Sequence, residues 1–328
     1  MNTMLAPRLA AVHAPQDEDA RRAALLEVLR TLDGYGYRFV TVTPGSHARV
    51  VKRPDRQEAT SVRDVLGWSL PFKPDVVPAA LLEQLRAAGV ISDHEGGRLR
   101  ANLRVSSVRG TLFLHSAYPT DSYDSVFLGP DSYRFADYII AKMGELPAGA
   151  RILDYGAGAG VGGITAARNA AGARLVLADI NPKALFLASI NAEFAGLQYE
   201  VVEAQSPEEV EGFFDLIVTH PPFMMDSEGR AYRDGGDLYG TRLSLEWVLE
   251  GFAKLNPGGR LILHTGVSIV RGEDVLLERL RGALPADEAI IDYHELDPDI
   301  FSEDLDQPAY REVERIAAVG LCVTRRLN

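Results

Sequence analysis

The chain has 328 residues, of which 46% are hydrophobic and 24% are charged, and its formal net charge at pH 7 is −12. Such a composition is that of an ordinary globular protein long enough for two domains. The single cysteine, Cys322, excludes an internal disulfide and a cysteine-rich zinc site, and no apolar run approaches the length of a membrane span. We therefore expect a cytoplasmic protein without a membrane segment.

Charge is distributed unevenly along the chain. Residues 1–120 carry 16 basic and 12 acidic side chains, whereas residues 121–328 carry 18 basic and 34 acidic ones. The acidic second part disfavours a polyanion lying across it, and the mildly basic first part leaves contact with nucleic acid or an acidic protein open. Scattered solvated charge explains the same distribution.

The first 120 residues predict a small helical unit followed by a β-hairpin. Apolar residues at helical spacing predict three helices, over residues 19–32, 61–66 and 79–88. The proline-containing stretch 44–59 predicts a loop, and alternating segments at 98–105 and 110–115 predict two strands joined by a turn. These elements fit a winged-helix-like domain over residues 1–120, a module that binds nucleic acid in some proteins and is an interaction or structural unit in others. The basic cluster of this part is Arg98, Arg100, Arg104 and Arg109, which is equally explained as the solvated face of the hairpin.

After a linker near residues 117–123, strand and helix patterns alternate. Short apolar runs predict strands over residues 151–154, 175–179, 199–203, 214–219 and 260–265. Helical patterns lie between them, and two further strands, at 289–296 and 314–325, close the chain. This alternation predicts a doubly wound α/β domain with a parallel sheet over residues 121–328.

The most informative stretch is the segment 152–163, where an apolar run ends in an acid and then becomes rich in glycine. Glycine permits positive φ and lets a ligand approach the main chain closely, and the helix that follows points N–H groups into the same space. The spacing of Gly158, Gly160 and Gly163, with Asp179 downstream, satisfies the dinucleotide fingerprint, so NAD is one candidate ligand.

Two further features favour a different nucleotide cofactor. Asp154 precedes the glycines in the pattern Asp-x-Gly-x-Gly-x-Gly, and a later strand ends in the rigid turn His220-Pro221-Pro222-Phe223. Together with Asp179-Ile180-Asn181, these segments resemble class I S-adenosylmethionine (SAM) methyltransferases. They are most similar to the subgroup with an Asn-Pro-Pro-Tyr/Phe loop, which includes release-factor glutamine and ribosomal RNA N-methyltransferases. The resemblance covers residues 126–325 and implies SAM as cofactor, S-adenosylhomocysteine as product, and a last strand antiparallel to its neighbour.

The resemblance implies a set of cofactor-binding residues, namely Asp154, Gly156, Gly158, Gly160, Asp179, Ile180, Asn181 and Gln205. Asp154 would order the glycine loop and help to hold the amino-acid portion of SAM, or it only braces the loop. Asp179 would accept hydrogen bonds from both ribose hydroxyls, and Ile180 or Asn181 would flank the adenine. The alternative role of Asp179 or Asn181 is to cap the N-terminus of the next helix. Gln205 stands where many relatives have an acid for the adenine amine, and its amide oxygen can also accept.

The turn at residues 220–223 is the expected catalytic loop. Its prolines fix φ, and Phe223 can stack on a flat acceptor. In place of the subgroup's Asn, neutral His220 offers one donor and one acceptor and, unlike Asn, can act as a general base. Three hypotheses stay open: His220 orients a nitrogen acceptor, it deprotonates a hydroxyl or ammonium acceptor, or the site has lost catalysis.

Four side chains are candidates for binding the methyl acceptor: Tyr133, Arg134, Tyr232 and Arg233. The first two follow a segment that closes over cofactor and acceptor in the resembling enzymes, although packing between domains explains them as well. The other two belong to the glycine-rich loop 224–240, whose length is typical of lids and binding loops. The acidic segment 297–306 would lie on the active-site side of the sheet and attract an amine or a cation, or it is a solvated turn.

The sequence therefore predicts SAM-dependent methyl transfer to nitrogen, in a glutamine amide of a protein or a base of structured RNA. A small-molecule N- or O-methyltransferase that uses His220 as base is the close alternative, and a non-catalytic SAM-binding scaffold is the alternative of another class. The acceptor is thus protein, RNA or a small molecule, and the net charge does not favour nucleic acid. We expect no metal.

Overall fold

The computed structural model describes residues 18–225 and 233–327 of the chain. Its main sheet has the strand order β11–β12–β9–β8–β5–β6–β7. The strands are β5 (Arg151–Tyr155), β6 (Arg174–Asp179), β7 (Gln198–Glu203), β8 (Phe214–Thr219), β9 (Leu255–Val270), β11 (Ala289–Asp297) and β12 (Arg315–Arg325). Strands β5 to β9 pair in parallel, and β12 runs antiparallel to both β9 and β11. The predicted doubly wound sheet and its antiparallel last strand are therefore confirmed.

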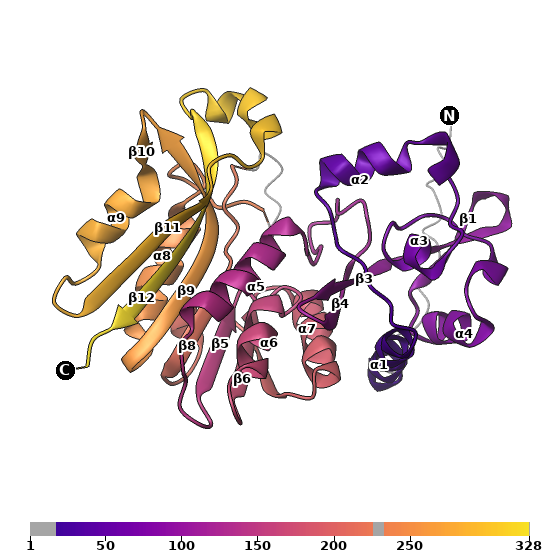
Figure 1. The fold of residues 1–328 in the computed structure, drawn as a ribbon, viewed down its shortest axis with the longest axis horizontal. Coiled ribbons are helices and arrows are strands. Elements are labelled where there is room, and N and C mark those ends of the chain that lie inside the picture. Colours follow the sequence, from indigo (N-terminus) through magenta and orange to yellow (C-terminus); the bar gives the residue numbers. More distant parts are fainter. Residues whose placement is uncertain (1–17, 226–232, 328) are drawn as a thin grey trace, which may run out of the picture.

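Helices cover both faces of this sheet (Figure 1). Three of them, α5 (Pro130–Lys142), α6 (Val161–Arg168) and α7 (Pro182–Phe194), share one hydrophobic core with the strands. Two others, α8 (Arg242–Ala253) and α9 (Val275–Ala283), belong to a second core on the opposite face. Successive residues of β5 show the division, because Ile152 belongs to the first core and Leu153 to the second. The short strand β10 (Glu273–Asp274) extends the edge of β9 by an antiparallel pairing.

The order of the strands positions a binding site. Chain connections leave β5 toward β6 and β7 on one side and return to β8 and β9 on the other, so the direction of winding reverses at β5. In open α/β sheets, ligands bind in the crevice beyond the carboxyl ends of the strands at such a reversal. The segments that follow β5, β6 and β8 therefore meet at one place.

Within residues 18–116, the N-terminal part has four α-helices, three short 3-10 turns and two small antiparallel sheets. The elements are α1 (Glu18–Gly34), α2 (Pro44–Val51), α3 (Val62–Leu66), α4 (Ala79–Ala87), β1 (Ile91–His94), β2 (Arg98–Ala101), β3 (Leu103–Val108) and β4 (Thr111–Ser116). The three predicted helices are confirmed. The predicted loop at 44–59 is wrong over its first half, because Pro44 opens α2 and the side chain of Thr43 caps it by accepting from the backbone N–H of Ser46.

The predicted hairpin is present but begins later than expected. The segment 98–105 is split, because β2 pairs back with β1 while β3 pairs with β4. The turn of the β3–β4 hairpin is only Arg109-Gly110, both at positive φ (45° and 80°), as in the two-residue turns that suit the twist of a hairpin. The arginines of this part do not form one basic face. Arg104 is buried and donates to the carbonyl of Ser116, whereas Arg109 forms an ion pair with Asp137.

A continuous core joins the N-terminal part to the large sheet. Buried residues of α1, α4 and the hairpin belong to the same hydrophobic cluster as α5, α6 and α7. The guanidinium of Arg22 in α1 donates to the hydroxyl of Ser189 at 2.6 Å and forms an ion pair with Glu193, both on α7. The division into domains 1–120 and 121–328 therefore stays a prediction. In the structure, the described residues of the two parts share one hydrophobic core.

Candidate active site

A cavity of about 470 Å³ lies at the carboxyl ends of the parallel strands. It is lined by residues 154–159, 161 and 162 at the end of β5 and in the loop after it, by residues 179–181 at the end of β6, and by residues 220–224 after β8, and α5 and α8 close its sides. Every predicted cofactor-binding residue except Gly160 and every residue of the predicted catalytic turn is among its lining residues. The motifs chosen from the sequence are therefore brought together in one place.

The glycine loop owes its shape to positive backbone angles and to Asp154. Gly156, Gly158 and Gly160 have φ of 69°, 54° and 79°, which side chains rarely adopt, and Gly160 is the N-cap of α6. One carboxylate oxygen of Asp154 accepts from the backbone N–H of Gly163 at 2.7 Å. Burial of Asp154, which is 2% exposed, raises its pKa to about 8, and the nearby charge of Asp179 adds to the shift.

Asp179 fastens the second strand to the glycine loop. Its two carboxylate oxygens accept from the backbone N–H of Gly158 at 2.8 Å and of Asn181 at 2.9 Å, and burial raises its pKa. Asn181 is the N-cap of α7, since its side chain accepts from the N–H of Lys183. A carboxylate oxygen can accept more than one hydrogen bond, so bracing the loop leaves Asp179 able to receive a ligand hydroxyl. Ile180, 55% exposed, and Gln205 line the same side of the cavity.

Trp247 is a lining residue that the sequence did not single out. It lies on α8, its ring stands edge-on to Tyr155 with centroids 4.5 Å apart, and a Cβ placed on Gly156 would lie 2.7 Å from it. The tryptophan therefore forms a flat wall directly behind the first glycine of the loop. The spacing of residues in the sequence holds no signal for this contact, because 91 positions separate the two.

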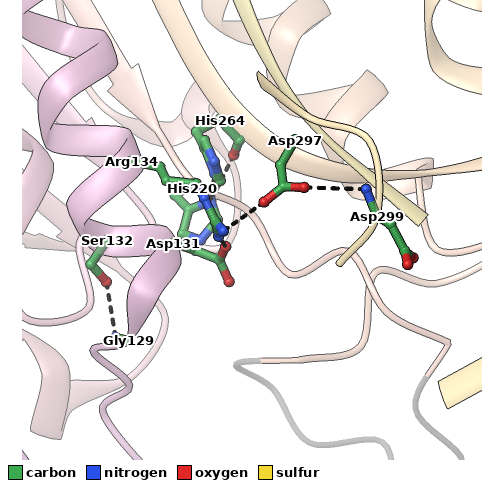
Figure 2. Close-up of polar contacts among 8 residues, drawn as sticks. All are labelled: Gly129, Asp131, Ser132, Arg134, His220, His264, Asp297 and Asp299. Atoms are coloured by element: carbon green, nitrogen blue, oxygen red, sulfur yellow. Dashed lines mark hydrogen bonds and ion pairs between the residues drawn. The ribbon is translucent and has the colours of Figure 1, made fainter. Parts of the chain in front are cut away.

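A hydrogen bond to the main chain fixes the tautomer of the neutral His220 ring. Its Nδ1 lies 2.6 Å from the carbonyl oxygen of His264 in β9, and a carbonyl can only accept, so Nδ1 carries the hydrogen. In the neutral ring, Nε2 is then the acceptor. The ring of His264 stands 4.9 Å from that of His220, and burial holds its pKa well below the usual range. Figure 2 shows the two rings beside α5.

Aromatic rings surround His220. Phe135 of α5 lies with its centroid 5.7 Å from the His220 ring, and Phe223 lies at 5.8 Å. Phe223 packs so closely over β9 that a Cβ on Gly266 would approach its ring to 2.3 Å. This half of the cavity can hold a flat or apolar group against His220.

The segment 297–306 at the end of β11 and after it borders the cavity through Phe301, and it is called the wall below. Two arginines hold this segment in place. Arg134 of α5 donates to Asp131 at 3.0 Å and to Asp297 at 2.8 Å, as Figure 2 shows. Arg233 binds both carboxylate oxygens of Asp304, at 2.7 and 2.8 Å. The acidic segment 297–306 does lie on the active-site side, as expected, but Asp297 and Asp304 are paired with arginines rather than open to a cationic ligand.

Phe301 lies in the sequence between Asp297 and Asp304, the two carboxylates that the arginines hold. Its φ of 54° is unusual for a residue with a side chain and costs on the order of 1 kcal/mol. Phe301 lines the cavity, and its ring centroid lies 5.9 Å from that of Phe223. From the sequence, only the acidic side chains of this segment were expected to face the cavity, whereas the structure places the Phe301 ring there.

The structure places the predicted acceptor-binding residues in different positions relative to the cavity. Arg233 lines the cavity, and Arg134 anchors its wall. Tyr133 does not reach the described lining. Its hydroxyl accepts from the backbone N–H of Thr41, so packing between the two parts of the chain accounts for it. Tyr232 lies outside the described residues.

No group of three or more His, Cys, Asp or Glu side chains within residues 18–225 and 233–327 could hold a metal ion. Over the same residues, no helix has the length and apolar character that crossing a membrane requires.

The sheet order and the glycine cradle at its reversal define a Rossmann-like nucleotide-binding domain. Residues 136–264, which hold the glycine loop, Asp179 and His220, match the family model described as "Methyltransferase small domain". The resemblance to SAM methyltransferases drawn from the motifs of this segment is therefore confirmed.

Two curated relatives match the same region. Ribosomal RNA small subunit methyltransferase C of Hahella chejuensis is 34% identical over 127 residues, which cover 39% of this chain and 34% of that protein. Release factor glutamine methyltransferase of Deinococcus radiodurans is 32% identical over 125 residues, which cover 35% of this chain and 45% of that protein. The chain therefore spans less than half the length of these relatives.

Solved structures of low sequence identity also resemble the chain. The SAM-dependent methyltransferase from Agrobacterium tumefaciens is 17% identical with a TM-score of 0.46, over 73% of this chain and 76% of that one.

Proposed function

We propose that this protein is a SAM-dependent methyltransferase that methylates a nitrogen atom of a macromolecule, in a protein glutamine or an RNA base. The observation that carries the proposal is the meeting of the glycine cradle and the His-Pro-Pro-Phe turn in one cavity. The names of the two curated relatives, one a ribosomal RNA and the other a release-factor glutamine methyltransferase, support a macromolecular acceptor.

The residues of the cradle fit the proposed cofactor. The positive-φ glycines leave bare main chain where side chains would fill the space, and the carboxylates of buried Asp154 and half-buried Asp179 line the same volume. Asp154 would lie toward the amino-acid portion of SAM, where an ammonium group would compensate its unfavourable burial. Asp179 would accept ribose hydroxyls, and Ile180 and Gln205 would border the adenine. SAM supplies an electrophilic methyl group bound to a sulfonium.

His220 would receive the acceptor on its Nε2 side. An N–H of the acceptor would donate to Nε2, which would orient the nitrogen toward the methyl group, and Nε2 would take up that proton when the nitrogen is methylated. The hydrogen bond from Nδ1–H to the carbonyl of His264 keeps the ring in the tautomer that can do this. Because methyl transfer is an in-line displacement, alignment by Phe135, Phe223 and the two prolines contributes as much as the base.

One observation favours a second candidate, a small-molecule N- or O-methyltransferase. The second part of the chain carries 34 acidic and only 18 basic side chains, which disfavours a polyanion across the cavity. In that function, Nε2 of His220 would deprotonate an amine or a hydroxyl of the small acceptor. The scaffold alternative predicts SAM binding without turnover.

Calorimetric titration of SAM and, separately, of NAD into the protein and its His220→Ala variant tests the proposal. We expect SAM to bind both proteins with equal affinity, because His220 is assigned to the acceptor side, and NAD to bind neither. Binding of NAD in place of SAM would overturn the assignment of the glycine loop.

A further inference from the structure

A second groove of about 410 Å³ lies directly beside the active-site cavity. Its walls are β1, β2, the start of α7 and a strap formed by residues 117–125, which connects β4 to the segment before α5. Arg100 and Lys183 supply its positive charge, and His94, Asn102, Ser122 and Ser125 supply further polar groups.

The lining of this groove is basic, whereas the chain as a whole is acidic. The chain has a net charge of −12, yet none of the described residues that line the groove is acidic. Arg100 is held in place by donating to the carbonyl of Tyr118 in the strap at 2.8 Å, and a guanidinium has further donors for an anion. Lys183 forms an ion pair with Asp124 at 3.3 Å in which both side chains are well exposed, so a stronger anionic partner can replace it at little cost.

The strap separates the groove from the active-site cavity by the thickness of one chain. Ser125 lines both spaces, Tyr118 and Ser122 line the groove, and Thr120 and Tyr123 line the cavity. The ring of Tyr123 lines the cavity and is 68% exposed. An extended ligand that enters the cavity can therefore cross the strap over this ring and reach the basic groove.

We propose that the groove binds backbone phosphates of a single-stranded RNA acceptor whose target base occupies the active-site cavity. The inference rests on the proposed function and selects RNA over protein as its acceptor. Phosphate oxygens would accept charge-assisted hydrogen bonds from Arg100 and Lys183, and a base next to the target would stack on Tyr123. These contacts fix the position of the strand without reading its sequence.

The arrangement also reconciles RNA with an acidic protein. Attraction is confined to a groove beside the cavity, and the acids of the second part repel the remainder of the strand. Such a surface suits a short unpaired segment or a loop better than a long duplex.

The test compares RNA binding by two doubly substituted variants. Arg100→Gln/Lys183→Gln removes two charges from the groove, and Arg279→Gln/Arg281→Gln removes two from the exposed face of α9, on the far side of the sheet (Figure 1). Fluorescence anisotropy of a labelled single-stranded RNA oligonucleotide of mixed sequence, titrated at several salt concentrations, gives the affinity and its salt dependence for each protein.

We expect the groove variant to bind RNA about tenfold more weakly and the slope of log affinity against log salt to fall by about 1.4, since each phosphate contact to a single strand contributes about 0.7. The α9 variant should bind as the wild type does. Lys183→Glu, a single change of an exposed side chain, should weaken binding in the same direction and guards against a folding defect of the Arg100 variant.

SAM calorimetry on all four proteins separates the two proposals. Unchanged SAM binding with equal RNA affinity in the groove and α9 variants would overturn the groove assignment and leave the methyltransferase proposal standing. Methyl transfer to protein by an enzyme that does not bind the oligonucleotide would overturn it as well. Loss of SAM binding by the wild type itself would instead contradict the proposed function.

Discussion

At the scale of single residues, the cavity depends on polar groups held under unusual conditions. Asp154 is a buried carboxylate that accepts from the backbone N–H of Gly163, and His220 is an imidazole whose tautomer is set by a carbonyl group on the neighbouring strand. Burial of the Asp154 carboxyl costs stability in the free protein, whereas the hydrogen bond of His220 fixes its ring, and both side chains present a defined group to a ligand.

Asp154 makes the stability of the protein depend on pH. Its pKa is raised to about 8 in the folded state, against an ordinary value near 4 in the unfolded chain. Between about pH 4 and pH 8 the unfolded state therefore binds fewer protons than the folded state, so the contribution of this group to stability falls as the pH rises. We expect Asp154→Asn, whose amide can still accept from Gly163, to flatten this dependence.

Differential scanning calorimetry without ligand from pH 5 to pH 8 provides the measurement. The wild type should lose more of its melting temperature over this range than the variant does. Parallel curves for the two proteins would show that Asp154 is ionised throughout and would remove the argument for its raised pKa.

At the scale of elements, the glycine loop and the wall after β11 shape opposite sides of the cavity. The loop could be predicted from sequence because its glycines, Asp154 and Asp179 follow a local pattern around strand ends. The wall could not, since Arg134 and Asp297 are 163 positions apart and only the strand order brings them together. Helix α2 was missed for a local reason, because proline at a helix start resembles proline in a loop.

Gly156 tests the loop. Alanine there would be strained at a φ of 69° and would meet the Trp247 ring at 2.7 Å, so we expect Gly156→Ala to weaken SAM binding at least tenfold. Gly172→Ala is the matched control, because its φ of 63° imposes the same strain while its nearest atom lies at an ordinary 3.8 Å. Calorimetric SAM titration that finds equal losses in both variants would refute the role of the contact with Trp247.

Arg134 tests the wall. Arg134→Gln removes the ion pairs with Asp131 and Asp297 that hold the segment carrying Phe301. We expect the KM for the methyl acceptor to rise severalfold while the Kd for SAM stays the same, because the wall belongs to the acceptor side. Arg109→Gln, which breaks an exposed pair with Asp137 on the same helix α5, should change neither constant. A raised Kd for SAM in the Arg134 variant would contradict this division of the cavity.

At the scale of the whole molecule, the N-terminal part is built into the cofactor side of the fold. Asn191 of α7 is fully buried and bonds to both backbone groups of Leu114 in the hairpin and to the carbonyl of Ala159 in the glycine loop. One side chain thus connects the two parts of the chain at the cradle. The composition predicted two domains, and only the packing shows that they share this connection.

Asn191→Ala would leave three buried backbone groups without their partner. We expect a loss of about 2–4 kcal/mol in the free energy of unfolding together with weaker SAM binding, because the glycine loop loses a support. Asn169→Ala is the control, since that amide donates only within its own helix end, to the carbonyl of Thr165. Chemical denaturation gives the stabilities, and unchanged SAM affinity in the Asn191 variant would show that the connection is structural alone.

Methyl transfer at His220 can be assayed directly with labelled SAM. The wild type and His220→Ala are incubated with SAM labelled in its methyl group and with RNA and protein fractions of a cell extract, and label in each macromolecule is counted. We predict that the wild type transfers label to RNA and that His220→Ala, with normal SAM affinity, does so about 100-fold more slowly. Transfer to neither fraction, or equal transfer by both proteins, would contradict the account.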